Sequence, residues 1–297
     1  MAELRTTHHL TVTEDMIDHL GHMNVRFYGQ AALAASGVLA PEAEDGIEVV
    51  PVDLYTRHFR EQLLGAELEV RSLVLGGGEG RLRLYHELRN AESDVLAASF
   101  VHLLEARRDG AAVTTWPPAT VPEHEIPEAG RPRSIDLDAD PVGPAPTFDQ
   151  VRGDEALALR NPRPVEAGEC GPDGRFDPGQ APLLVWGGTA LPDTDAPMLH
   201  EGPNGEQIGW ANMENRCVLL RRPRVGDRIQ SFGATVRVLE KNTHRVMWAY
   251  DVDRGDLLAT FEVIDLAFDT VSRRAVPLPD ARRRHVEARL RPQFAPR

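Results

Sequence analysis

The fold of this chain is decided by residues 24–37, which read NVRFYGQAALAASG. Nearly every position in this stretch is apolar or small, so a helix formed here is buried on most of its sides. Its small residues let neighbouring strands approach closely, and Gly37 is a typical C-terminal stop. The stretch therefore predicts a helix that begins after Asn24, ends at Gly37 and lies within a sheet wrapped around it.

A gapless internal repeat relates the two halves of the chain. Residues 64–68 (LGAEL) match residues 225–229 (VGDRI) at a spacing of 161, and the same spacing places residues 98–100 (ASF) on residues 259–261 (ATF). Around these matches, alternating apolar and polar residues predict long antiparallel strands in both halves. The expected strands cover residues 68–74, 81–88 and 95–105 in the first half, and 229–239, 244–252 and 257–268 in the second.

The composition excludes several classes of function. The 297 residues include 33 basic and 46 acidic side chains, a net charge of −13, which argues against nucleic-acid binding. No apolar run reaches the roughly 18 residues of a membrane helix, and we expect a cytoplasmic protein. Cys170 and Cys217 fit neither a CxxC metal pair nor a disulfide framework, and Asp18, His19 and His22 lack a further spaced ligand. Phosphate-binding glycine motifs are absent, so no metal and no cofactor are predicted.

Proline and charge patterns predict the domain organisation. Residues 113–147 are rich in proline and alanine, which disfavours helix and central strand and indicates an extended linker. We therefore expect an N-terminal domain over residues 1–112 and a C-terminal domain over residues 148–280. Residues 281–297 are predicted to be a basic, solvated tail.

A short motif precedes the predicted helix. Residues 18–24 read DHLGHMN and run into a helix that contains aromatic residues. This motif resembles the opening of hotdog-fold acyl-CoA thioesterases of the 4-hydroxybenzoyl-CoA thioesterase-like superfamily, particularly those associated with betaine and carnitine metabolism. The resemblance covers Val12 to about Glu105. With the repeat, it implies an α+β double hotdog, in which two antiparallel sheets each wrap around a central helix and form an internal pseudo-dimer.

The motif also predicts the chemistry of a site. A helix N-terminus offers unpaired N–H groups, so the amides of Gly21 and His22, expected to enter the helix, would hold a thioester oxygen. The resemblance implies that Asp18 is a general base or nucleophile; its alternative is a helix cap or an Asx turn. His22 would shape the site, and Asn24 would orient water, bond to Asp18 or cap the helix. Tyr28 is a candidate for substrate binding or the core.

The second half lacks this motif. At the spacing of 161, the positions of Asp18 and His22 fall on Gly179 and Leu183, and residues 180–188 are predicted to form a degenerate central helix. One active site per chain is therefore expected. Because sites in paired hotdogs lie between units, Glu214 and Asn215 are candidate substrate-binding residues, with an edge or turn role as the alternative.

The sequence thus predicts an acyl-CoA thioesterase that acts on acyl-CoA or acyl-carrier protein. The chain is expected to form a homo-oligomer of double-hotdog copies. Two alternatives remain: a hotdog enoyl-CoA hydratase or dehydratase, and a non-catalytic module that binds acyl-CoA or acyl-carrier protein.

Overall fold

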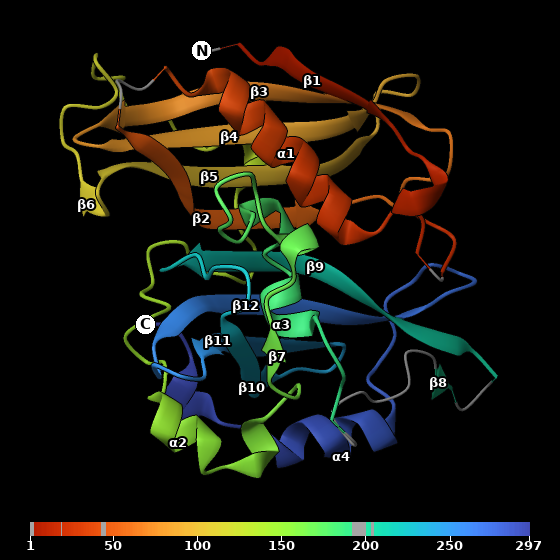
Figure 1. Cartoon of the computed structure of the whole chain (residues 1–297). Coiled ribbons are helices and arrows are strands. Elements are labelled where there is room, and N and C mark those ends of the chain that lie inside the picture. Colours follow the sequence, from red (N-terminus) through yellow and green to blue (C-terminus); the bar gives the residue numbers. More distant parts are fainter. Residues whose placement is uncertain (1–2, 19, 43–45, 192–199, 203–204) are drawn as a thin grey trace. The chain divides into compact units, whose positions relative to one another are not determined.

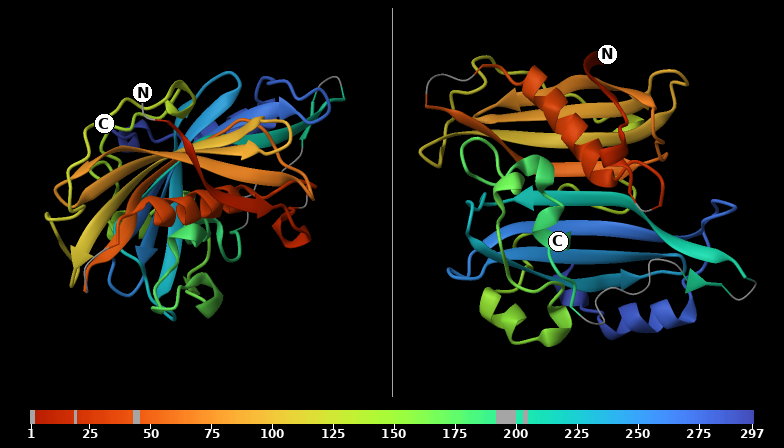
Figure 2. Two further views of the ribbon diagram at one scale, coloured as in Figure 1. Left: turned by 90° about the horizontal axis from the view of Figure 1, so that it is seen from above. Right: turned by 45° about the vertical axis from the view of Figure 1, so that its right-hand side comes forward.

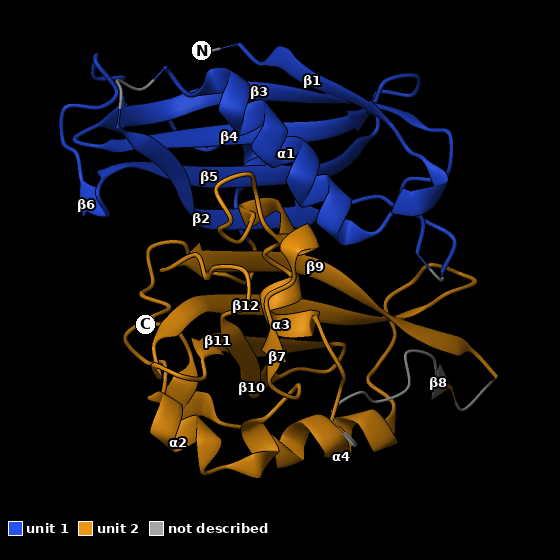
Figure 3. Ribbon diagram, in the orientation of Figure 1, with its two compact units in different colours: residues 1–132 blue, residues 133–297 orange. Residues whose placement is uncertain are grey.

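The computed structural model describes residues 3–18, 20–42, 46–191, 200–202 and 205–297. The chain divides into two compact units, residues 1–132 and 133–297 (Figure 3). This division differs from the predicted organisation, because the proline-rich residues 113–147 are shared between the two units and do not form a separate connector.

Unit 1 is built on one antiparallel sheet (Figure 1). Its strands lie in the order β1-β3-β4-β5-β2, with the short β6 paired to the end of β5. Their bounds are β1 Arg5–Thr11, β2 Glu48–His58, β3 Glu67–Gly78, β4 Arg81–Asn90, β5 Leu96–Arg108 and β6 Ala111–Ala112.

Helix α1, Val25–Leu39, lies along one face of this sheet (Figure 2). Half of its buried residues are alanines, which pack with Leu68, Val70 and Leu88 of the strands. The predicted stop at Gly37 is wrong by two residues. The helix continues because Leu39 is buried in a second apolar cluster with Leu82, and it ends just before Pro41, which disfavours helical geometry in the residue ahead of it.

Residues 113–132 pack against the sheet of unit 1 at two places. Trp116 is buried in the apolar cluster that also holds Leu39 of α1 and Leu82 of β4. Further along, the Ser99 hydroxyl donates a hydrogen bond to the Ala129 carbonyl (2.7 Å). Gly130 lies so close to the Tyr85 ring that a Cβ there would be 2.4 Å from it. This stretch therefore covers part of the sheet. Proline has no amide hydrogen, so the stretch leaves few backbone donors without a partner, and its apolar side chains are stabilised by burial against the sheet.

Unit 2 has a sheet of the same design. Its strands lie in the order β9-β12-β11-β10-β7, and β8 pairs with β9. Their bounds are β7 Arg163–Pro164, β8 His200–Glu201, β9 Gln207–Leu219, β10 Arg228–Val238, β11 Asn242–Asp251 and β12 Leu257–Asp269.

The structure confirms the predicted duplication. Strands β11 and β12 have the bounds of β4 and β5 shifted by 161 positions. The bulges follow the same shift: the register of β3 with β4 slips between Val74 and Gly76, and that of β10 with β11 slips between Thr235 and Arg237. Because a bulge marks a specific local kink, its repetition at the same spacing shows that the two sheets share one design.

The helices of unit 2 are shorter than α1 of unit 1. The predicted degenerate helix is one turn, α3 (Leu183–Trp186), whose Val185 carbonyl accepts a hydrogen bond from Ser231 of β10 (3.0 Å). The expected solvated tail contains α4 (Asp280–Ala288), with Val286 buried, and Arg291 donates its amide hydrogen to the Thr235 carbonyl (2.7 Å). The C-terminal residues are therefore part of unit 2.

Helix α2 (Phe148–Arg152) contributes Val151 to a core cluster that includes Trp248.

Candidate active site

The predicted motif forms a closed turn just ahead of α1. The Asp18 amide donates to the His22 carbonyl (2.9 Å), and the Gly21 amide donates to the Asp18 carbonyl (3.0 Å). Gly21 has a φ of +85°, a conformation that side-chain-bearing residues seldom adopt. Ile17 and Met23 form a β-bridge across the base of the turn, which fixes its two ends side by side.

Asn24 joins this turn to the helix. Its amide donates to the Met16 carbonyl (2.8 Å), and its side-chain oxygen accepts a hydrogen bond from the Arg26 amide (3.0 Å). Asn24 is thus the N-cap of α1, one of the three roles that the sequence left open.

The carboxylate of Asp18 is partly shielded, with 16% of its side chain exposed. Its Oδ1 accepts a hydrogen bond from the Leu20 amide (2.8 Å), which is the Asx turn considered as the alternative. Its Oδ2 lies 3.4 Å from Nδ1 of His22. Asp18 therefore has one oxygen held by the turn and the other beside an imidazole.

A second carboxylate, which the sequence analysis missed, contacts the same imidazole. Oε1 of Glu61 lies 3.3 Å from Nε2 of His22. Glu61 follows strand β2, and the Met23 amide donates to the carbonyl of the next residue, Gln62 (2.8 Å), which brings the two loops together. Glu61 is 39 positions from His22 in the chain, and no local motif connects them.

Tyr28 lies in the first turns of α1 and belongs to the core. Its side chain is buried and its hydroxyl donates to the Arg60 carbonyl (3.3 Å). Burial raises the pKa of Tyr28 to about 12; the Gln62 amide opposes this rise and the negative charge of Asp18 adds to it. Its ring meets that of His58 edge-on at 5.5 Å between centroids, and burial lowers the pKa of His58 to about 4.

The amides available for a substrate oxygen include one of the two expected donors, His22, but not the other, Gly21. Helix α1 begins at Val25, so Gly21 and His22 precede it, and the Gly21 amide is already bonded within the turn. Within the described residues, the backbone amides of His22 and Val25 have no hydrogen-bond partner. Val25 occupies the first helical position, where an unsatisfied amide and the positive end of the helix dipole coincide.

Unit 2 contains the same turn with different side chains. The pattern of amide–carbonyl pairs in residues 14–24 recurs in residues 167–177, at a spacing of 153. The Gly171 amide donates to the Arg175 carbonyl (2.9 Å), and the Gly174 amide donates to the Gly171 carbonyl (3.0 Å). Asp177 accepts a hydrogen bond from the Gly179 amide (2.8 Å), as Asn24 does from that of Arg26.

This correspondence corrects the placement of the second motif. Asp18 corresponds to Gly171 and His22 to Arg175, which lie eight positions before Gly179 and Leu183, where the constant spacing of 161 put them. The backbone of the turn has been kept in unit 2, but the carboxylate and the imidazole have been replaced. Unit 1 therefore carries the candidate site, and the sequence analysis expects one site per chain, in this N-terminal half.

The two predicted substrate-binding residues of unit 2 have structural contacts. The buried carboxylate of Glu214 accepts hydrogen bonds from the amides of Arg133, Ser134 and Ile135 at 3.1–3.3 Å. The side chain of Asn215 donates to that of Asn212 (3.3 Å). Glu214 thus anchors the segment that opens unit 2, and these contacts correspond to the structural alternative. Their role in substrate binding stays a prediction.

We expect Glu214→Ala to destabilise the chain by about 1–3 kcal/mol, because the amides of residues 133–135, among them that of the buried Ile135, lose their acceptor. Thermal unfolding would measure this change, with the exposed Glu155→Ala as the matched control. A KM that rises severalfold at unchanged stability would instead support the predicted contact with substrate.

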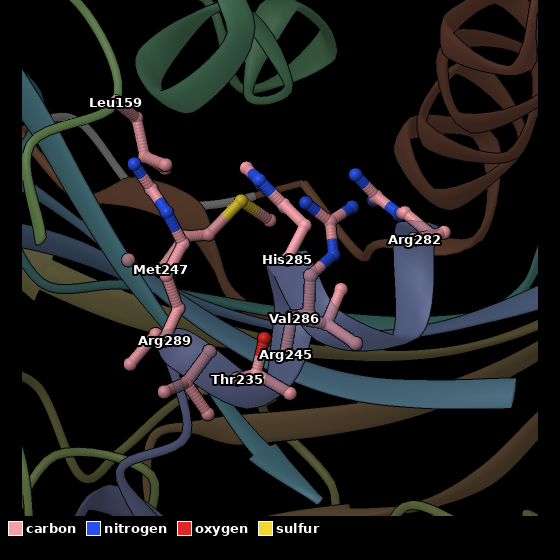
Figure 4. Close-up of a pocket in the computed structure, with 11 residues that line it drawn as sticks. Leu159, Thr235, Arg245, Met247, Arg282, His285, Val286 and Arg289 are labelled. Atoms are coloured by element: carbon pink, nitrogen blue, oxygen red, sulfur yellow. The ribbon is translucent and has the colours of Figure 1, made fainter. Parts of the chain in front are cut away.

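A described cavity lies in unit 2 under α4 (Figure 4). Basic side chains contribute to its lining, among them Arg245, Arg282, His285 and Arg289. Arg245 is neutralised by Asp265, to which it donates a hydrogen bond (2.7 Å). Nowhere in the described ranges do three histidine, cysteine or acidic side chains gather in a way that could hold a metal ion. Of the helices the structure describes, none is both long and apolar enough to cross a membrane.

Sequence comparison relates the chain to one thioesterase-containing protein. It is 29% identical over 147 residues to the L-carnitine dehydrogenase/betainyl-CoA thioesterase of Agrobacterium fabrum. The aligned region covers 47% of this chain and 28% of that protein, so this chain spans well under two thirds of its relative. No protein-family model matches the chain.

Structural comparison gives matches over nearly the whole chain. The 12:0-ACP thioesterase of Umbellularia californica matches with a TM-score of 0.62 and 9% identity, over 90% of this chain and 94% of that one. An acyl-ACP thioesterase of Bacteroides thetaiotaomicron matches with 0.60 and 9%, over 88% and 97%. Rv0216 of Mycobacterium tuberculosis, a double-hotdog protein, matches with 0.57 and 12%, over 90% and 96%. The chain is therefore a double-hotdog protein, distantly similar in sequence to a betainyl-CoA thioesterase.

Proposed function

We propose that this chain hydrolyses acyl-CoA thioesters at the turn that precedes α1 in unit 1. The observation that carries the proposal is the position of the Asp18 carboxylate: one oxygen is held by the turn, the other lies beside the His22 imidazole, and the side chain is partly shielded from solvent. The name of the similar Agrobacterium protein supports a CoA thioester as substrate.

In the proposed reaction, water attacks the thioester carbonyl carbon while Asp18 accepts its proton. The C–S bond then breaks, and the leaving thiolate receives a proton to give CoA and the free acid. As an alternative, the Asp18 carboxylate attacks the carbonyl carbon first, and the C–S bond breaks to release the CoA thiolate, which takes up a proton. The mixed anhydride that forms is then hydrolysed by water to the free acid and the Asp18 carboxylate.

Negative charge that develops on the carbonyl oxygen needs hydrogen-bond donors. The amides of His22 and Val25 are suited to this role because both lack partners among the described residues, and that of Val25 lies at the positive end of α1. Gly21, which the sequence predicts as a donor together with His22, would have to break its bond to the Asp18 carbonyl before its amide could take part.

A thiol-release assay over a panel of acyl-CoA thioesters tests the proposal. The panel should include betainyl, aryl and medium-chain acyl groups, each also presented on acyl-carrier protein. We expect release of free CoA from at least one member. Binding without thiol release over the whole panel would contradict hydrolysis and favour a non-catalytic module, and water addition to an enoyl-CoA, followed by absorbance, would favour a hydratase.

A further inference from the structure

Glu61 is the feature of the site that neither the motif nor the proposed reaction accounts for. We infer that Glu61 is a positioning residue for the proposed thioester hydrolysis, and that it acts through His22 by holding the imidazole against the carboxylate of Asp18. This inference rests on the proposed function, since it concerns the residue taken to act on the substrate.

The geometry places one imidazole between two carboxylates. Nδ1 of His22 lies 3.4 Å from Oδ2 of Asp18, and Nε2 lies 3.3 Å from Oε1 of Glu61. The exposed fractions of the side chains are 16% for Asp18, 17% for His22 and 36% for Glu61, so the imidazole is mostly shielded while Glu61 faces it from the solvent side. An ionised carboxylate only accepts hydrogen bonds, so each carboxylate is an acceptor for the ring nitrogen that it faces, and Glu61 on the Nε2 side thereby fixes the orientation of the ring.

The second copy of the turn shows that the fold does not require these side chains. In unit 2 the same pairs of amides and carbonyls form although Gly171 and Arg175 stand for Asp18 and His22. The strand offset of 161 puts Arg222, a cation, at the position of Glu61. The Phe176 amide still donates to the Pro223 carbonyl (2.8 Å), as that of Met23 does to Gln62. The loops therefore meet without a carboxylate at this position.

The stability of the fold also gives little reason for a carboxylate at position 61. Glu61 is more than one third exposed, and ion pairs of exposed side chains contribute little to folding. Glu61 lies beside the shielded imidazole of His22, in the copy of the turn that carries Asp18. A role in the proposed reaction explains this position better than a contribution to stability does.

A double-mutant cycle tests the inference. We expect Glu61→Ala to lower kcat about tenfold with KM within about twofold, and to have no further effect in a His22→Ala background, because residues in one network are not additive. Glu61→Gln keeps an acceptor oxygen and should recover part of the loss. Glu67→Gln, which removes a carboxylate near the start of β3 that accepts from Thr11, should stay within about twofold of wild type. Additive losses in the double variant, or no loss in Glu61→Ala, would overturn the inference.

A measurement that does not depend on activity separates this inference from the proposed function. Nitrogen-15 NMR of the His22 side chain should show a changed Nε2 shift in Glu61→Ala and a changed Nδ1 shift in Asp18→Asn. An unchanged Nε2 shift in Glu61→Ala would refute the positioning role. If wild type releases no thiol from any substrate, the proposed function fails, while the NMR comparison still reports whether Glu61 orients the ring.

Discussion

Replacing Asp18 with asparagine is expected to lower kcat for thioester hydrolysis by about 10²–10⁴-fold, the range in which positioned acid–base groups contribute. Asparagine has nearly the shape of aspartate, and its Oδ1 can still accept the hydrogen bond from the Leu20 amide. The turn before α1 should therefore keep its conformation. The lost property is the ability to accept a proton from water or to attack the carbonyl carbon.

The matched control for this variant is Asp15→Asn, three positions earlier. Asp15 is exposed, and its carboxylate accepts a hydrogen bond from the Thr13 hydroxyl (2.6 Å), so it shares the local charge but not the position beside His22. We expect its kcat to stay near that of wild type and both variants to unfold at similar temperatures. Thiol release by Asp18→Asn at the wild-type rate, on the best substrate, would remove Asp18 from the mechanism.

Isotope labelling distinguishes the two roles of Asp18. In a single turnover in ¹⁸O-labelled water, a general base leaves the label in the released acid alone. A nucleophile forms an anhydride, and attack of water on the Asp18 carbonyl carbon then leaves the label in the protein. Mass spectrometry of the peptide that contains Asp18 would detect it.

Much of the fold could be predicted because the signals are local or repeated. The strands of both units follow an alternation of apolar and polar residues, and the spacing of 161 holds from β4 to β11 without a gap. The alternation and the internal repeat are each weak signals, but they predict the same strands. The start of α1 was also readable, since Asn24 is a strong helix cap ahead of a small apolar stretch.

The second copy of the turn could not be found in the same way. Its spacing is 153 rather than 161, and Gly21 with Gly174 is the one identical pair between residues 14–24 and 167–177. What the two copies share is a backbone hydrogen-bond pattern, which many sequences can satisfy. Glu61 was missed for a related reason: its contact with His22 arises from the meeting of two loops, and neither loop carries a signal for it.

The polar core of unit 1 was not predicted either, and it gives the second large expected effect: unit 1 should lose stability steeply as pH falls below about 6.5, the ordinary pKa of histidine. His86 and His102 lie beneath α1 and are buried. Ser36 of α1 is 2.9 Å from Nε2 of His86 and 2.9 Å from Nδ1 of His102, and Ser72 is 2.7 Å from Nδ1 of His86.

Burial lowers the pKa of both histidines, to about 3 for His102, and for His86 the neighbouring charge of His102 adds to the effect. A histidine whose pKa is lowered in the folded state remains neutral there while the unfolded chain takes up a proton. Above the pKa of the histidine in the unfolded chain, the free energy of unfolding is not reduced by this effect. Below that pKa, the free energy of unfolding falls by roughly 1.4 kcal/mol per pH unit for each histidine, until the pH reaches the pKa of the folded state.

Unit 2 provides the variant that tests this expectation. The spacing of 161 places Met247 and Val263 at the positions of His86 and His102. In His86→Met/His102→Val the serines keep other partners: the Ser36 hydroxyl still donates to the Ala32 carbonyl (3.1 Å), and Ser72 still bonds to Thr7 (2.7 Å). No buried hydroxyl is therefore orphaned by the exchange.

Urea unfolding of the full chain between pH 7 and pH 4.5, followed by circular dichroism, measures the effect. The urea midpoint of wild type should fall more steeply with decreasing pH than that of the double variant, while the exposed His124→Gln should follow wild type. Some acid sensitivity should persist in the double variant, because burial also lowers the pKa of His58, to about 4. Parallel slopes in wild type and the double variant would show that this core accepts protons without loss of packing, and that the serine–histidine network does not make unit 1 sensitive to acid.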